Sequence, residues 1–250
     1  MIRLFQLVLL PILALGGLVD ANPGHAADAF SPAQRVEIVR ILRDALVADP
    51  SILRDAVAAM QTAEKQRQDE DARARVAANA AKLIEPTDPG AGNPQGDVTI
   101  VEFFDVRCPY CKRMEQPMTD LLSGDRRVRL VYKDLPVLGP ASVIGAKALL
   151  AAQKQGHYDR LRDALMHTDV PITLESIRSE AQKLGLDWAQ LAKDMEDPEI
   201  EARLQSNLKL AASLGIQGTP AFVIGGELLP GAVDLNELQR AVGAARMVSK

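Results

Sequence analysis

The sequence predicts an α/β fold, in which helices surround a small sheet and a helical arm comes first. Three observations support this prediction. A β-branched and aromatic run, Val98–Phe104, is followed by the chain's two cysteines and then by a helical pattern. Residues from about 140 to 214 have apolar positions at helical spacing, and a strand-like run at 218–226 follows them. Two helical stripes occupy residues 27–85.

Length and composition limit the classes of protein to consider. The chain has 250 residues, of which 47% are hydrophobic and 25% charged, so it can form one full globular domain with an appendage. The net charge of −4 provides no basic surface for nucleic acid, and the 4% of aromatic residues argues against a base-stacking platform.

The first 26 residues have the pattern of a secretory signal peptide. Arg3 is the only early charge, Leu4–Val19 is uncharged and mostly apolar, and Gly24-His25-Ala26 offers a cleavage site, with a second at Val19-Asp20-Ala21. The alternative is an uncleaved anchor, but this apolar run is shorter than the ~20 residues of a spanning helix. We expect export to an oxidising compartment, where two cysteines form a disulfide unless they are kept reduced.

Residues 27–85 are expected to form a helical arm. Ser31-Pro32-Ala33-Gln34 fits a capping box with proline in the first turn, and a second helix is expected over 50–84. The two apolar stripes are Val36, Val39, Leu42, Leu46 and Ile52, Leu53, Val57, Met60. A segment this small cannot bury both stripes, so we expect self-association; the alternative is a helical hairpin packed on its own catalytic domain. The Pro- and Gly-rich residues 86–97 are expected to be a linker to a domain at 98–250.

The cysteine pair lies where a strand ends and a helix begins. Cys108 is expected near the helix N-cap, with Pro109 in the first turn. Free backbone N–H groups and the helix dipole favour a thiolate at Cys108, while Cys111, one turn deeper, can close a disulfide or resolve a mixed one. A structural disulfide and half of a zinc site are the alternatives. Such a bond would constrain little chain, and zinc needs four ligands, so we predict redox chemistry without metal or cofactor.

The rest of the domain is predicted as an alternation of further strands and helices. A second strand is expected at 128–132, helices at 140–155, 158–167, 174–184 and 188–214, a Thr-Pro strand and hairpin at 218–231, and a last helix at 235–247.

Two motifs in this order carry a family resemblance. They are Phe103-Phe104-Asp105 leading into Cys108-Pro109-Tyr110-Cys111, and Gly218-Thr219-Pro220-Ala221-Phe222. Through them residues 93–250 resemble the DsbA-like thiol-disulfide oxidoreductases of bacterial periplasms, which implies a thioredoxin fold with a helical insertion at about 140–214. Residues 30–85 resemble the N-terminal helices of ScsC-like and Com1-like members. That likeness implies a homo-oligomer, with a trimer favoured and a dimer possible.

The resemblance also implies roles for individual residues. Pro220 should be cis, placing the Thr219 backbone beside the sulfurs to pair with a substrate peptide; a trans proline in a turn is the ordinary alternative. Glu102 matches the family's partly buried acid beneath the disulfide, which moves the proton of Cys111, and its alternative is a solvated edge-strand glutamate. Tyr110 stands where the family's strongest oxidants have histidine.

The predicted function is that of a periplasmic protein disulfide isomerase or reductase. Its expected partners are exported proteins that contain cysteine, a membrane thiol reductase and further copies of itself, with no nucleic acid. Several active sites around one cleft would favour isomerisation. The alternatives are a DsbA-like dithiol oxidase and a copper(I)-binding protein of the copper-tolerance type, in which Met114 would join Cys108 and Cys111.

Overall fold

The computed structural model describes residues 30–248, so the expected signal segment, 1–26, lies outside the described residues. The chain divides into two compact units, Met1–Gln61 and Thr62–Lys250. The helices are α1 (Pro32–Ala48), α2 (Ser51–Ala78), α3 (Ala80–Leu83), α4 (Pro109–Gly124), α5 (Pro140–Lys154), α6 (Tyr158–His167), α7 (Leu174–Lys183), α8 (Trp188–Asp194), α9 (Pro198–Leu214) and α10 (Leu235–Val248). The strands are β1 (Gly90–Gly92), β2 (Val98–Phe104), β3 (Val128–Asp134), β4 (Ala221–Ile224) and β5 (Glu227–Pro230).

The described part of the first unit consists of α1 and the first turns of α2. The predicted capping box is present at the start of α1, where Ser31 accepts from the Gln34 N–H and the Gln34 side chain accepts from the Ser31 N–H. No residue of α1 is buried, and the large apolar residues of both predicted stripes are exposed.

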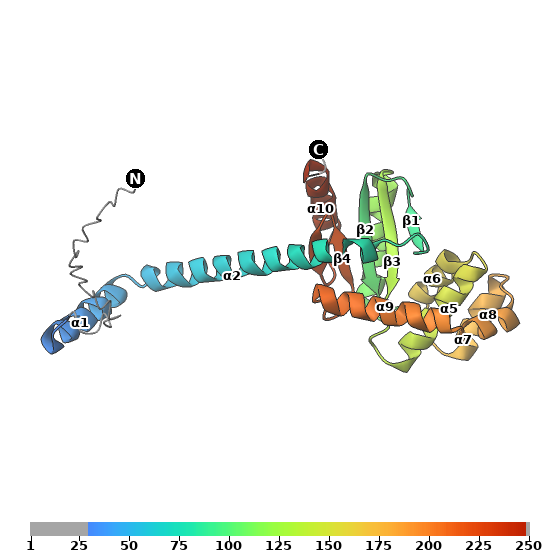
Figure 1. Ribbon diagram of the computed structural model, residues 1–250, viewed down its shortest axis with the longest axis horizontal. Coiled ribbons are helices and arrows are strands. Elements are labelled where there is room, and N and C mark those ends of the chain that lie inside the picture. Colours follow the sequence, from blue (N-terminus) through green and yellow to red (C-terminus); the bar gives the residue numbers. More distant parts are fainter. Residues whose placement is uncertain (1–29, 249–250) are drawn as a thin grey trace, which may run out of the picture. The chain divides into compact units, whose positions relative to one another are not determined.

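The second unit is built on a five-stranded mixed sheet with the order β1-β3-β2-β4-β5. β2 pairs with β3 in parallel and with β4 antiparallel, so it is the central strand, as its continuous apolar run predicts. Figure 1 shows β2 and β3 side by side, with α5–α8 grouped together to one side of the sheet. The thioredoxin fold with a helical insertion is therefore confirmed, and α5–α9 form the insertion between β3 and β4.

Alternate side chains of β2 enter two apolar cores on opposite faces of the sheet. Ile100 and Phe104 pack with α4, α5, α6 and α10, whereas Val101 and Phe103 pack with α9 and the end of the arm segment. Glu102 has the same parity as Ile100, so its carboxylate lies on the face that α4 and α6 cover.

The segment expected to be a linker, 86–97, contains β1 and is anchored to the domain. Gly90–Gly92 pairs antiparallel with β3, and a Cβ on Gly90 would lie 2.1 Å from the Leu130 carbonyl oxygen, which only glycine avoids. Asp88 bonds two cations from other elements: Lys133 Nζ is 2.7 Å from its Oδ2, and Arg203 Nη2 is 2.9 Å from its Oδ1. The sequence shows no strand or helix periodicity here, because a strand of three residues and one buried ion cluster are too short to give a repeating apolar pattern.

The second predicted helix is interrupted before its expected end at 84. α2 ends at Ala78, and Asn79 donates from its side-chain amide to the Arg75 carbonyl before the short α3 begins. Val76 and Leu83 are buried in the second core, and Arg75 donates to the Leu214 carbonyl. Residues 62–85 therefore belong to the second unit.

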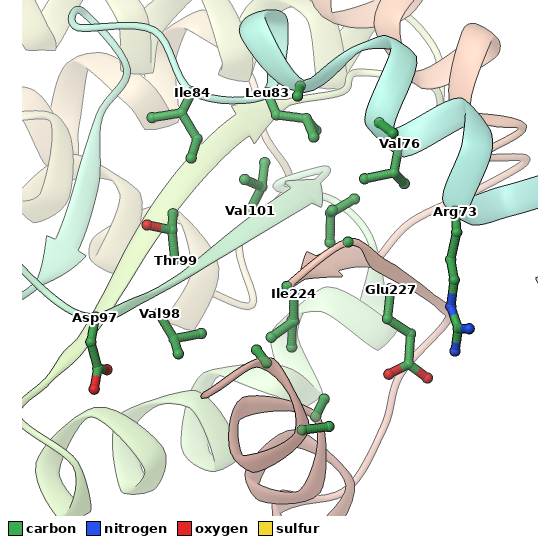
Figure 2. Close-up of a pocket in the computed structure, with 18 residues that line it drawn as sticks. Arg73, Val76, Leu83, Ile84, Asp97, Val98, Thr99, Val101, Ile224 and Glu227 are labelled. Atoms are coloured by element: carbon green, nitrogen blue, oxygen red, sulfur yellow. The ribbon is translucent and has the colours of Figure 1, made fainter. Parts of the chain in front are cut away.

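A cavity of about 680 Å³ lies between the end of the arm segment, the start of β2, the β4–β5 hairpin and α10. Figure 2 shows Val76, Leu83 and Val101 on one side of this cavity and Ile224 on the other, with Arg73 and Glu227 toward its edge. Neither cysteine lines it. Within residues 30–248, no helix is both long and apolar enough to cross a bilayer.

Candidate active site

The cysteine pair lies at the junction of β2 and α4, as predicted. Cys108 is the N-cap residue of α4, Pro109 occupies the first turn and Cys111 is one turn deeper. Asp105 fixes the connection, because its backbone carbonyl accepts from the Cys108 N–H at 2.9 Å and its Oδ2 accepts from the N–H groups of Val137 and Leu138 at 3.0 and 3.1 Å. These hydrogen bonds hold the loop that leads into α4 and so position Cys108.

Cys108 contacts the loop that precedes β4, although 111 residues separate the two in sequence. Its Sγ donates to the Thr219 carbonyl oxygen at 3.2 Å, and the Thr219–Pro220 peptide bond is cis, as predicted. Both thiols are free. The pairing of Phe103 with Ala221 across β2 and β4 brings the two motifs to the same end of the sheet.

Cys111 differs from Cys108 in its surroundings. Its side chain is fully buried, and this burial raises the pKa of its thiol well above the usual range. The charges of Cys108 and Glu102 raise it further, while a hydrogen bond at the Asp105 backbone acts in the opposite direction. The surroundings of Cys111 therefore favour its neutral thiol form.

Glu102 is buried, as predicted, with 1% of its surface exposed. Burial raises the pKa of its carboxyl to about 7, against the attraction of Arg162 and with the added repulsion of Glu115. A carboxyl with this pKa exchanges its proton near neutral pH, as an acid–base group must. The alternative of a solvated edge-strand glutamate is wrong, because β2 is central and covered on both faces.

Of the other predicted site residues, Tyr110 lies at the surface and Met114 lies in the core. Tyr110 is 54% exposed, and the Arg113 guanidinium lies 4.2 Å from the centre of its ring. Lys112 donates to the Thr168 carbonyl at 2.5 Å, so its ammonium is held by the helical insertion. Met114 is 2% exposed and belongs to the core.

A cavity of about 970 Å³ opens beside Thr219 and Pro220. Its other walls are β5, part of α10 and the face of α2 from Lys65 to Arg75, all within the second unit. β5 is an edge strand, so its outer backbone groups are available to a bound polypeptide. The contribution of α2 was not predicted, since its polar run resembles any solvated helix face.

The roles of Arg162 and Glu115 are not evident from the sequence. Arg162 is 5% exposed and lies on the buried face of α6, on which Tyr158, Leu161 and Leu165 are also buried. A cation in the middle of an apolar helical stripe is the signal that could have identified it, because such a residue needs a buried partner. Its partners come from α4 and β2, and no local pattern names them.

The comparisons agree with this geometry. The family model of the DSBA-like thioredoxin domain matches residues 99–243. The chain belongs to that family. A thioredoxin-like oxidoreductase from Silicibacter pomeroyi is 44% identical, with a TM-score of 0.64 over 65% of this chain and 94% of that one. ScsC from Proteus mirabilis in a transitional conformation is 31% identical, with a TM-score of 0.63 over 86% of this chain and 98% of that one.

This chain is also similar to part of longer curated proteins. A Na⁺/H⁺ antiporter, NhaA 1 of Salinispora arenicola, is 28% identical over 169 residues, which cover 65% of this chain and 26% of the antiporter. The chain thus spans about a quarter of the length of that relative.

Proposed function

We propose that the protein is a periplasmic thiol-disulfide oxidoreductase that acts mainly as a disulfide isomerase and reductase. The observation that carries this proposal is the asymmetry of the two thiols. Cys108 is the N-cap residue of α4 and its Sγ donates a hydrogen bond to the Thr219 carbonyl, whereas Cys111 is fully buried and this burial raises the pKa of its thiol. Membership of the DSBA-like family supports the same chemistry.

The first step is attack by the Cys108 thiolate on a substrate disulfide. A bond forms between Cys108 Sγ and one substrate sulfur, the substrate S–S bond breaks, and the released substrate thiolate takes a proton. The helix N-terminus stabilises the attacking thiolate. The Thr219 carbonyl, which accepts the hydrogen bond from Cys108, lies where the backbone of an extended substrate can pair with the backbone of this loop. The cavity beside Thr219 and Pro220 would receive that segment.

Two routes lead out of the mixed disulfide. In isomerisation, another substrate thiolate attacks the substrate sulfur bound to Cys108, a new substrate disulfide forms and Cys108 leaves as a thiolate, so no net oxidation occurs. In reduction, Cys111 gives its proton to the Glu102 carboxylate and attacks Cys108 Sγ. The Cys108–Cys111 disulfide forms as the bond between Cys108 and the substrate sulfur breaks, and the released substrate thiolate takes a proton, so the substrate leaves with two thiols. A Cys111 thiol whose pKa is raised by burial would resolve the mixed disulfide slowly, which favours isomerisation.

The proposed setting follows from the chain as a whole. The pattern of residues 1–26 supports export to the periplasm, where exported proteins that contain cysteine would be substrates and a membrane thiol reductase would return the pair to its reduced form. We propose that residues 27–85 assemble several copies of the chain, with a trimer favoured by the family likeness. The exposure of Val36 and Met60, 71% each in the single chain, supports this assembly.

Insulin reduction tests the thiol chemistry. The mature protein with dithiothreitol should accelerate insulin precipitation, and Cys108→Ala should abolish the acceleration. A wild-type rate no faster than that of Cys108→Ala would contradict the proposal. Titration with copper(I) against a chelator, run in parallel, identifies a metal-binding protein instead if the thiol pair binds copper tightly and insulin is not reduced.

A further inference from the structure

Beneath the thiol pair, three charged side chains share one buried site. Arg162 Nη1 donates to Glu115 Oε2 at 2.9 Å and Nη2 donates to Glu115 Oε1 at 2.8 Å, a two-pronged ion pair. The same Nη2 lies 3.6 Å from Glu102 Oε2. One cation therefore faces two carboxyls. The summed charge of these three side chains is −1 when both carboxyls are ionised.

Two aromatic rings also contact the Arg162 guanidinium. Its central carbon lies 4.0 Å from the centre of the Tyr132 ring and 4.6 Å from that of Phe104. Tyr132 is the register partner of Glu102 on β3. The rings and the Glu115 fork both hold the cation, so Glu102 shares it with Glu115.

The remaining surroundings of Glu102 offer it little else. Its Oε1 has no hydrogen-bond partner among the described residues. On β4 its register partner is Phe222, which has no charge. The titratable groups that act on Glu102, Cys111 or Arg162 itself are Glu115 and Cys111 from α4, Cys108 at its N-cap, Tyr132 and Asp134 from β3, and Tyr158 and Asp159 from α6.

We infer that Arg162 is a positioning residue that sets when Glu102 can accept the proton of Cys111, because its charge is divided between Glu102 and Glu115. Because Arg162 gives both of its hydrogen bonds at this site to Glu115, its charge stabilises ionised Glu102 only in part, and both the neutral and the ionised forms of Glu102 are accessible. A cation committed wholly to Glu102 would keep that carboxyl ionised, and no cation at all would keep it protonated. The helical insertion thus adjusts the resolving step of the thiol chemistry.

The inference rests on the proposed function only through the relay to Cys111, so its first readout is independent of activity. The pKa of the Glu102 carboxyl is measured by ¹³C NMR on the full reduced chain. Arg162→Gln removes the cation, and the pKa of Glu102 should rise by roughly one unit or more. Glu115→Gln leaves the whole cation to Glu102, and the pKa should fall. Arg162→Lys, the matched control, retains the charge and should return the pKa close to that of the wild type.

The second readout is the pH dependence of the step in which Cys111 resolves a preformed mixed disulfide on Cys108. The rate of this step should rise with pH as Glu102 ionises. The rise should occur at higher pH in Arg162→Gln and at lower pH in Glu115→Gln than in the wild type. An unchanged pKa of Glu102 in Arg162→Gln, or an equal change in Arg162→Lys, would overturn the inference.

Should Arg162→Gln fail to fold, Glu115→Gln decides the question, because an unchanged or raised pKa of Glu102 there refutes the division of charge. The two proposals also fail separately. Opposite shifts of the Glu102 pKa without insulin reduction would refute the proposed function alone, and insulin reduction without those shifts would refute the role of Arg162 alone.

Discussion

Replacement of Glu102 by glutamine should change how the stability of the reduced protein depends on pH. Burial raises the pKa of this carboxyl from its usual 4.5 to about 7 in the folded state. Between these values the folded protein holds a proton that the unfolded chain has released, so the wild type loses stability as the pH rises through this interval. The difference corresponds to about 3 kcal/mol, at ~1.4 kcal/mol for each pKa unit, as an upper limit for one fully buried group.

Glu102→Gln cannot ionise, so it should not lose this free energy of unfolding. Urea unfolding followed by far-UV circular dichroism, with excess phosphine to keep both thiols reduced, measures the effect at pH 5 and pH 8. The variant should gain about 2–3 kcal/mol over the wild type between the two pH values. Glu175→Gln, which changes an exposed glutamate on α7, should show no such gain. A parallel pH dependence of Glu102→Gln and wild type would refute a buried carboxyl with a raised pKa.

Three further outcomes are expected. At pH 7, iodoacetamide should modify Cys108 at least about tenfold faster than Cys111, because burial raises the pKa of the Cys111 thiol; equal rates in a mass-spectrometric time course would contradict this. Thr219→Val should shift the ratio of oxidase to isomerase activity and cost about 1 kcal/mol or less in urea unfolding, since only one hydroxyl is lost; an unfolded variant would contradict it. Leu42→Glu with Leu53→Glu should give a folded monomer by sedimentation that loses isomerase but keeps oxidase activity, because burial of each leucine at a subunit interface contributes roughly 1.5–3 kcal/mol; wild-type sedimentation as a monomer would contradict the assembly.

Features that depend on neighbours in sequence were predicted well. The run from Val98 to Phe104 identifies a buried strand because both faces are apolar, and the cysteines follow it at the start of a helix. The position of Glu102 within that run implies burial, which the structure confirms. The helices of the insertion were also predicted, except that 188–214 is divided into α8 and α9 by a turn at Asp197, which caps α9.

Features that depend on distant residues could not be predicted in the same way. Lys133 and Asp88 are 2% and 0% exposed in their side chains, and their pairing draws a Pro- and Gly-rich segment into the domain. Arg162 meets its partners only because α4, α6 and β2 converge on one face of the sheet. In the sequence, one member of such a pair is visible as an exception to the local pattern, such as a cation on an apolar helix face. The local pattern does not identify its partner.

The central claim, that this thiol pair rearranges disulfides in proteins, is tested most directly with scrambled ribonuclease. The reduced mature protein, in catalytic amount and with no glutathione, should restore ribonuclease activity, and Cys108→Ala should restore none. Because isomerisation needs only the first thiol, Cys111→Ala should retain part of the activity while it accumulates mixed disulfides visible by mass spectrometry. Recovery of ribonuclease activity by the wild type no faster than by Cys108→Ala would contradict the account.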